Sequence, residues 1–113
     1  MVATMNVRDA ARECEAKLNA LFRYFKGTKL GAALAEASRD ARLVYESSTD
    51  AQEESCGMAL YDSLNAARHA AAVCRRNGWR SAHADICALV GEFGNAPFSW
   101  VNADGTVKRS EAR

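Results

Sequence analysis

The chain is short of residues that interrupt helices and of segments that direct a protein to a membrane. Its one proline, Pro97, leaves nearly all of the preceding chain free of this helix breaker. No stretch approaches the roughly 18 uninterrupted apolar residues that a membrane span requires. The N-terminus lacks the basic start and apolar run of a signal peptide. We therefore expect a protein that stays in the cytoplasm and crosses no membrane.

Sequence motifs for catalysis are also absent. There is no glycine-rich phosphate loop, no nucleophile elbow and no HExxH sequence. The 4 cysteines are widely spaced and form no CxxC pair, a pattern that indicates reduced thiols in a cytoplasmic protein. We therefore predict a protein that is not an enzyme and that needs no cofactor.

The nearest approach to a chemical site is a set of three residues around one turn. His83 and Cys87 are four residues apart, so on a helix both side chains leave the same face. Cys74 precedes the turn at a similar distance and is the third ligand of an alternative zinc site. Cys74 and His83 are also an alternative nucleophilic pair, although no loop supplies an oxyanion site.

Composition indicates one soluble globular domain. Hydrophobic residues make up 49% of the 113 residues and charged residues 26%, and this length suits a single core. The formal net charge of +1 does not favour a strongly basic nucleic-acid binder. Any electrostatic function must therefore come from the distribution of charge along the chain.

Apolar residues recur at intervals of three and four over most of the sequence, which is the pattern of amphipathic helices. This periodicity predicts helices over about 7–26, 29–47, 50–77 and 81–93. Short loops between long helices place consecutive helices antiparallel. We therefore predict an all-α protein, an antiparallel four-helix bundle that forms a single domain over 1–113.

Capping residues define the ends of these helices. Asn6 is a suitable N-cap for the first helix, and Gly27 and Gly78 stand where glycines end the first and the third. Thr49, with Gln52 three residues on, forms a capping-box pattern for the third helix. Ser81 is the predicted N-cap of the fourth.

Alanine is abundant in the third predicted helix, at positions 66, 67, 70, 71 and 72. Alanine favours helix and lets helix backbones approach closely, so this helix is our candidate for the centre of the bundle. Alanine on several faces equally suits packing against a second copy, and a homodimer is an open alternative.

The C-terminal extension, 95–113, differs in character from the helices. Residues 98–101 and 106–108 have the composition of two short strands around an Asn-Ala-Asp-Gly turn. Two strands alone are marginal in water, so Phe98 and Trp100 must lie on the bundle or on a partner. The extension is therefore either a β-hairpin or a disordered tail.

In an up-down-up-down bundle the first and third loops fall at the same end. Both loops are rich in cations and contain no acid. We call this surface the basic end and define it by the residues Arg23, Lys26, Lys29, Arg75, Arg76, Trp79 and Arg80. The opposite end collects acidic residues: Asp9, Glu46, Asp50, Glu53, Glu54 and Glu92.

Helix dipoles alone favour cations in the last turns of the first and third helices, and this explanation requires no partner. The alternative is a binding surface, because arginine beside an aromatic side chain is typical of interface hot spots. Trp79, in a turn between Gly78 and Arg80, either serves such a surface or folds back onto the end of the bundle.

The sequence therefore predicts a non-enzymatic protein–protein interaction module. It would dock through the basic end onto a larger partner that has an acidic surface, with residues 98–100 as an optional second contact. An inhibitor or adaptor encoded by a phage or another mobile element would suit this size and lack of chemistry. A nucleic-acid-associated regulator that uses the same surface is the main alternative, and a small metal-binding protein is the third.

Overall fold

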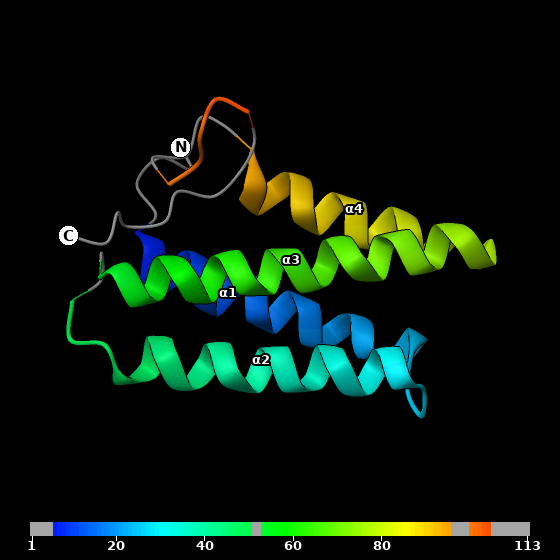
Figure 1. Cartoon of the computed structure of the whole chain (residues 1–113), viewed down its shortest axis with the longest axis horizontal. Helices are drawn as coiled ribbons and strands as arrows, with labels where there is room; N and C mark the ends of the chain where they lie inside the picture. The colour runs from blue at the N-terminus through cyan, green and yellow to red at the C-terminus, as the bar shows by residue number, and fades with distance from the viewer. Residues whose placement is uncertain (1–5, 51–52, 96–99, 105–113) are drawn as a thin grey trace.

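The computed structural model describes residues 6–50, 53–95 and 100–104. It contains helices α1 (Val7–Ala20), α2 (Lys29–Ser47), α3 (Glu54–Asn77) and α4 (Arg80–Gly94), with a short 3₁₀ helix η2 (Leu21–Tyr24) after α1. The four long helices pack into a bundle, as the sequence predicts, and successive helices run in opposite directions (Figure 1).

Helix α3 lies at the centre of the bundle. It contacts α1, α2 and α4, whereas α2 and α4 do not contact each other within the described part of the chain. Figure 1 shows α2 and α4 on opposite sides of the α1–α3 pair. Small buried residues on both central helices, such as Ala10 and Ala11 of α1 and Ala67 and Ala70 of α3, permit this close approach. The prediction of a central alanine-rich helix is confirmed.

The alanines of α3 also bear on the homodimer alternative. Ala67 and Ala70 are fully buried, and Ala66 and Ala71 pack partly buried against the core. Of these alanines only Ala72 is exposed. The alanine-rich faces are therefore used within the chain, and they no longer argue for a second copy.

Helix α1 is shorter than predicted. Asn6 caps its start, where the Asn6 Oδ1 atom accepts a hydrogen bond of 2.7 Å from the Asp9 amide. The α-helix ends at Ala20 instead of continuing to residue 26, and η2 follows it directly. The change to the tighter 3₁₀ form is common at the end of a helix, because the last amides bond three residues back. Gly27, with a φ of 82°, completes the turn.

Helix α2 spans the range that the sequence predicts. Thr28 is its N-cap, since the Thr28 Oγ1 atom accepts a hydrogen bond of 3.0 Å from the Gly31 amide. The same hydroxyl donates to the carbonyl of Phe25 at 2.6 Å. One threonine therefore joins the 3₁₀ turn to the helix that follows.

The predicted start of α3 at residue 50 is wrong. The Glu53 amide donates to the Asp50 carbonyl at 3.0 Å, and the helix begins at Glu54. Glu53, in an extended conformation and without a side-chain cap bond, occupies the N-cap position predicted for Thr49. The connection before α3 is bound to α1, because the Ser48 carbonyl accepts a hydrogen bond of 3.1 Å from Arg8. We attribute the later start of the helix to this contact.

The start of α4 also differs from the prediction. Helix α3 ends in a Schellman motif, in which the Trp79 amide donates to the Cys74 carbonyl at 2.9 Å and the Gly78 amide donates to the Arg75 carbonyl at 3.3 Å. This tight ending leaves only Gly78 and Trp79 between the two helices. Trp79, and not Ser81, is therefore the N-cap of α4, and Arg80 is the first helical residue.

The described part of the C-terminal extension packs on the bundle. Trp100 and Val101 are buried, and the Trp100 indole Nε1 donates to the Phe93 carbonyl at 3.1 Å. The predicted strand at 106–108 and the side chain of Phe98 lie outside the described residues. Within residues 100–104, Val101 forms an isolated β-bridge between turn residues, and no strand is present.

Candidate functional site

The first and third loops are neighbours at one end of the molecule, where Figure 1 shows the turns before α2 and α4. The rings of Phe25 and Trp79, one from each loop, lie 6.1 Å apart between centroids. Phe25 is fully buried, and its ring centroid also lies 6.1 Å from that of Tyr24. A row of three aromatic rings therefore forms the apolar centre of the basic end.

Trp79 combines the two arrangements that its position suggests. Its ring packs against Phe25, so it partly covers the end of the bundle. It nevertheless remains 42% exposed, and Tyr24 beside Phe25 remains 37% exposed. Because tryptophan is large, this exposed fraction leaves much apolar surface available for contact.

The cations of the basic end surround these rings. Lys26, Lys29, Arg75, Arg76 and Arg80 are all exposed. None of them forms an ion pair with a residue that the structure describes. These cations are therefore available to form ion pairs with carboxylates of a partner.

Arg23 differs from the other cations because it is engaged with Tyr24. Its guanidinium carbon lies 4.9 Å from the centroid of the Tyr24 ring, and its Nη2 atom donates to the Tyr24 hydroxyl at 3.4 Å. The Tyr24 hydroxyl in turn donates to the Asp85 carboxylate of α4 at 2.6 Å. The hydrogen bond to Tyr24 raises the pKa of Arg23.

Asp85 is a site residue that the sequence reasoning missed. It places an acid beside a surface that was expected to be free of acids, and it holds Tyr24 against α4. The sequence signal that could have identified Asp85 was its position five residues after Arg80, because a side chain this close to the turn can reach the other loop.

Helix dipoles account for only part of this charge pattern. Arg75 and Arg76, in the last turn of α3, are favoured by the negative end of that helix. Lys29 and Arg80 are the first residues of α2 and α4, and neither helix has an acid in its first turn. A cation at the positive end of a helix costs about 0.3–1 kcal/mol. These two residues therefore lower the stability of the helix ends that they occupy.

A pocket of about 620 Å³ opens at the corner where η2 passes into α2, and we call it the corner pocket. Its lining is mostly apolar, with two cations, and consists of Phe22, Arg23, Phe25, Lys26, Gly27, Thr28, Gly31, Ala32 and Ala35. A smaller pocket of about 310 Å³ lies across the two loops, between Tyr24 and residues 79–82. Both pockets border the basic end.

Gly31 sets the shape of the corner pocket. A Cβ atom built on Gly31 would lie 2.2 Å from the carbonyl oxygen of Phe25, far inside van der Waals contact. Only glycine lets the first turn of α2 approach the preceding turn so closely.

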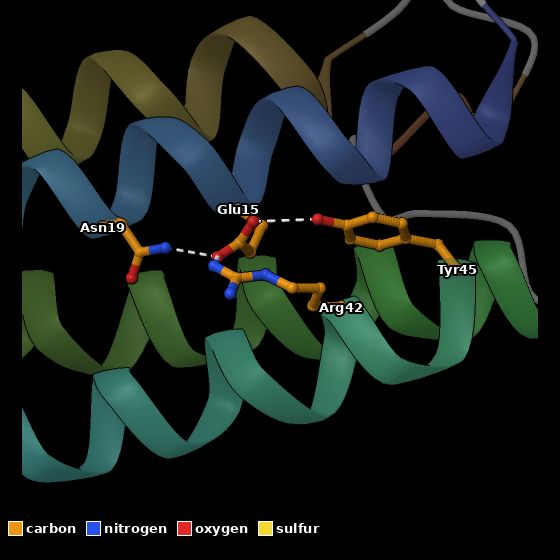
Figure 2. Close-up of polar contacts among 4 residues, drawn as sticks. All are labelled: Glu15, Asn19, Arg42 and Tyr45. Atoms are coloured by element: carbon orange, nitrogen blue, oxygen red, sulfur yellow. Dashed lines mark hydrogen bonds and ion pairs between the residues drawn. The ribbon is translucent and has the colours of Figure 1, made fainter. Parts of the chain in front are cut away.

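Away from the basic end, a buried polar cluster joins α1 to α2 (Figure 2). Glu15 is 3% exposed, and its carboxylate accepts hydrogen bonds from the Tyr45 hydroxyl at 2.8 Å and from the Arg42 guanidinium at 2.6 Å. The side-chain amide of Asn19 also donates to it. Burial, and then the hydrogen bond to Glu15, raise the pKa of Tyr45 to about 12.

This cluster has the features of a structural contact. Every donor around Glu15 satisfies the carboxylate, and neither pocket is lined by any of the four residues. Sequence reasoning did not identify Glu15, because the sequence alone does not distinguish a buried charged residue of an amphipathic helix from exposed ones such as Glu13 and Lys17.

The cysteines and histidines do not assemble a metal site. The Cys87 sulfur lies 3.5 Å from the His83 Nε2 atom, so the predicted pair on one helix face is present. Cys74 does not join it as a third ligand, since no three metal-binding side chains converge among the described residues. Burial and the nearby Cys87 raise the pKa of the Cys74 thiol. His83 thus contacts Cys87, and no hydrogen bond joins Cys74 and His83 within the described residues, so the alternative nucleophilic pair is not formed.

At the opposite end, several acids are already engaged. Glu92 pairs with Lys17 of α1 at 2.6 Å, and Asp9 with Arg12 at 3.6 Å. These acids therefore differ in their pairing from the cations of the basic end, most of which form no ion pair with a described residue.

Comparison of the chain with protein-family models, with curated proteins and with solved structures gives no match. Within the described residues, no helix has both the length and the apolar character that crossing a bilayer requires.

Proposed function

We propose that this protein is a non-enzymatic interaction module of the cytoplasm, which docks through the basic end onto an acidic surface of a larger protein. The observation that carries the proposal is the position of Lys29 and Arg80. Both are first residues of helices, where a cation is disfavoured, neither has an ion pair with a described residue, and both belong to the basic end with the half-exposed Trp79. Residues that reduce local stability without an internal partner are characteristic of binding surfaces.

Occupancy is the mechanism that this surface supports. Its aromatic row supplies a rigid apolar centre, and the surrounding cations supply charge complementarity, which raises association rates and excludes basic partners. A compact domain bound in this way acts as an inhibitor that covers the partner's surface, or as an adaptor that tethers it.

The test is affinity capture from the cell of origin, followed by titration of each recovered protein against the purified chain. Trp79→Ala and Lys29→Glu/Arg80→Glu are the disrupting variants. Arg39→Glu is the matched control, because Arg39 is exposed on α2 and lies away from both loops. We expect the wild type and Arg39→Glu to recover the same partner, and the disrupting variants to lose roughly tenfold or more in affinity.

Equal recovery by all variants would show that the basic end is not the docking surface.

Nucleic-acid binding by the same surface is distinguished by its dependence on salt. A protein that neutralises several phosphates loses affinity steeply between about 50 and 200 mM salt. We expect weak retention on DNA and RNA at both concentrations. Tight retention at about 50 mM salt that falls steeply by about 200 mM, and that is lost in Arg75→Ala/Arg76→Ala, would favour a nucleic-acid-associated regulator instead.

A further inference from the structure

The corner pocket is apolar, whereas the rest of the basic end is charged. Phe22 contributes accessible aromatic surface, and the exposed Ala32 and Ala35 of α2 add apolar surface, whereas Phe25 in the lining is itself fully buried. Its volume of about 620 Å³ lies within the roughly 300–1,000 Å³ range of pockets that bind ligands. It therefore has room for more than one apolar side chain.

Cations stand at the edge of this pocket. Arg23 and Lys26 belong to its lining and are both exposed. Lys29, one residue after the lining residue Thr28, adds a third positive charge without an ion pair among the described residues. An apolar segment without acids would bury these cations unpaired, which is unfavourable, whereas flanking carboxylates would pair with them.

We infer that the corner pocket binds an acidic amphipathic segment of the protein partner, with its apolar side chains against Phe22 and the alanines of α2 and its carboxylates on Arg23 and Lys26. The inference rests on the proposed function, because it specifies which part of the partner docks. The basic end then works in two parts: the aromatic row and Arg80 contact the partner's surface, and the corner pocket holds one segment of it.

The experiment uses a matched pair of substitutions on α2. Ala35→Trp places a large side chain in the lining of the pocket. Ala33→Trp places the same side chain on the same helix, at an exposed position that does not line the pocket. Both variants retain every cation of the basic end, and thermal unfolding establishes that both are folded.

The probe is a random peptide library, selected against the full-length wild-type chain. We expect the enriched peptides to combine adjacent apolar residues with flanking Asp or Glu. Their affinity should fall roughly tenfold or more in Ala35→Trp and remain unchanged in Ala33→Trp. Enrichment of basic or uncharged peptides, no enrichment, or equal binding to both tryptophan variants would each overturn the inference.

The captured partner separates this inference from the proposed function. If Ala35→Trp binds the partner like wild type while Lys29→Glu/Arg80→Glu does not, the segment does not occupy the corner pocket and docking through the basic end still stands. If both variants bind like wild type, both proposals fail.

Discussion

Glu15 is a carboxylate in surroundings where burial ordinarily disfavours its charged form. Hydrogen bonds from Tyr45, Arg42 and Asn19 offset that cost (Figure 2). Arg42 keeps 47% of its side chain exposed, so the ion pair retains contact with water on one side. The cluster therefore fixes the rotation of α2 relative to α1 without burying a second charge.

Replacing Tyr45 by phenylalanine removes one donor from this buried carboxylate. A hydrogen bond to a charged group contributes about 1.5–3 kcal/mol, so Tyr45→Phe should lower the free energy of unfolding by that amount. Urea-induced unfolding of the wild type and the variant measures the difference.

The control is Tyr24→Phe, which removes a hydroxyl bonded to Asp85 at 2.6 Å in exposed surroundings. Solvent replaces that bond, so a loss of at most about 1 kcal/mol is expected. Equal losses in the two variants would contradict the special importance of the buried cluster.

The raised pKa of Tyr45 also predicts the response of the fold to alkaline pH. Tyr45 has a pKa of about 12 in the folded protein against an ordinary 10.0, so above pH 10 the unfolded chain loses this proton first. Stability from this group is complete below pH 10 and is lost as the pH rises towards 12. Cys14, with a pKa raised from 9.0 to about 12 chiefly by burial, adds a loss that starts near pH 9.

Urea midpoints between about pH 8 and 12 should therefore decline, and the decline above pH 10 should be smaller in Tyr45→Phe than in the wild type. The same decline in both proteins would show that Tyr45 does not contribute to it.

At the scale of elements, the junction of η2 and α2 is tightly constrained. Thr28 bonds both sides of it, and Gly31 makes room for the Phe25 carbonyl. The junction determines where the rings of Phe22 and Phe25 lie, and so it determines the shape of the corner pocket.

Gly31→Ala should therefore destabilise the protein. The added methyl group would lie 2.2 Å from a backbone oxygen, which cannot move without shifting the turn. Overpacking of this kind costs about 1–3 kcal/mol. Thermal unfolding, read by circular dichroism, measures the loss.

Gly91→Ala is the matched control within a helix. Its added methyl group would lie 3.3 Å from the side-chain amide of Asn95, which is exposed and can rotate away. Removing a helical glycine there should stabilise the protein by about 0.5–1 kcal/mol. A loss of stability in Gly91→Ala as large as that in Gly31→Ala would remove the steric argument.

Most of the helices could be predicted from the sequence, because their signals are local. The apolar periodicity defines α2 within its observed bounds, and Asn6 and Gly78 act as the predicted caps. The predicted starts of α3 and α4 were wrong, because long-range or backbone contacts determine where these helices begin. Arg8 bonds the Ser48 carbonyl from 40 residues away, and the Schellman motif leaves a linker of only Gly78 and Trp79.

The candidate site was predictable in outline and not in detail. Antiparallel helices bring the first and third loops together, and the Phe25–Trp79 contact confirms that they meet. Asp85 and the corner pocket could not be predicted. Asp85 reaches Tyr24 across 61 residues of sequence, and the pocket depends on a 3₁₀ turn that the periodicity assigned to the first helix.

At the scale of the whole molecule, a formal net charge of +1 conceals a strongly uneven distribution. The N-terminal ends of α2 and α4 and the C-terminal end of α3 meet at the basic end, and all three carry cations. Dipole stabilisation can account for the cations of α3 and opposes those of α2 and α4. Two charge reversals at the same end should therefore affect stability in opposite directions.

Lys29→Glu/Arg80→Glu replaces a cation by an acid at the first residue of two helices, where an acid is favoured. The free energy of unfolding should rise by about 0.3–1 kcal/mol per substitution. Arg75→Glu/Arg76→Glu changes the net charge equally but places acids at the end of α3, and the free energy of unfolding should fall by a similar amount. Urea unfolding at low ionic strength measures both changes, and added salt should diminish them.

Partner capture by these two double variants then completes the argument. If the basic end is the docking surface, both should lose the partner, although one is more stable than the wild type and the other less. A more stable variant that no longer binds would show that Lys29 and Arg80 serve recognition at the expense of stability. If Lys29→Glu/Arg80→Glu were instead destabilised like its counterpart, dipole effects would not govern these positions, and the main physical reason for assigning them to a binding surface would be lost.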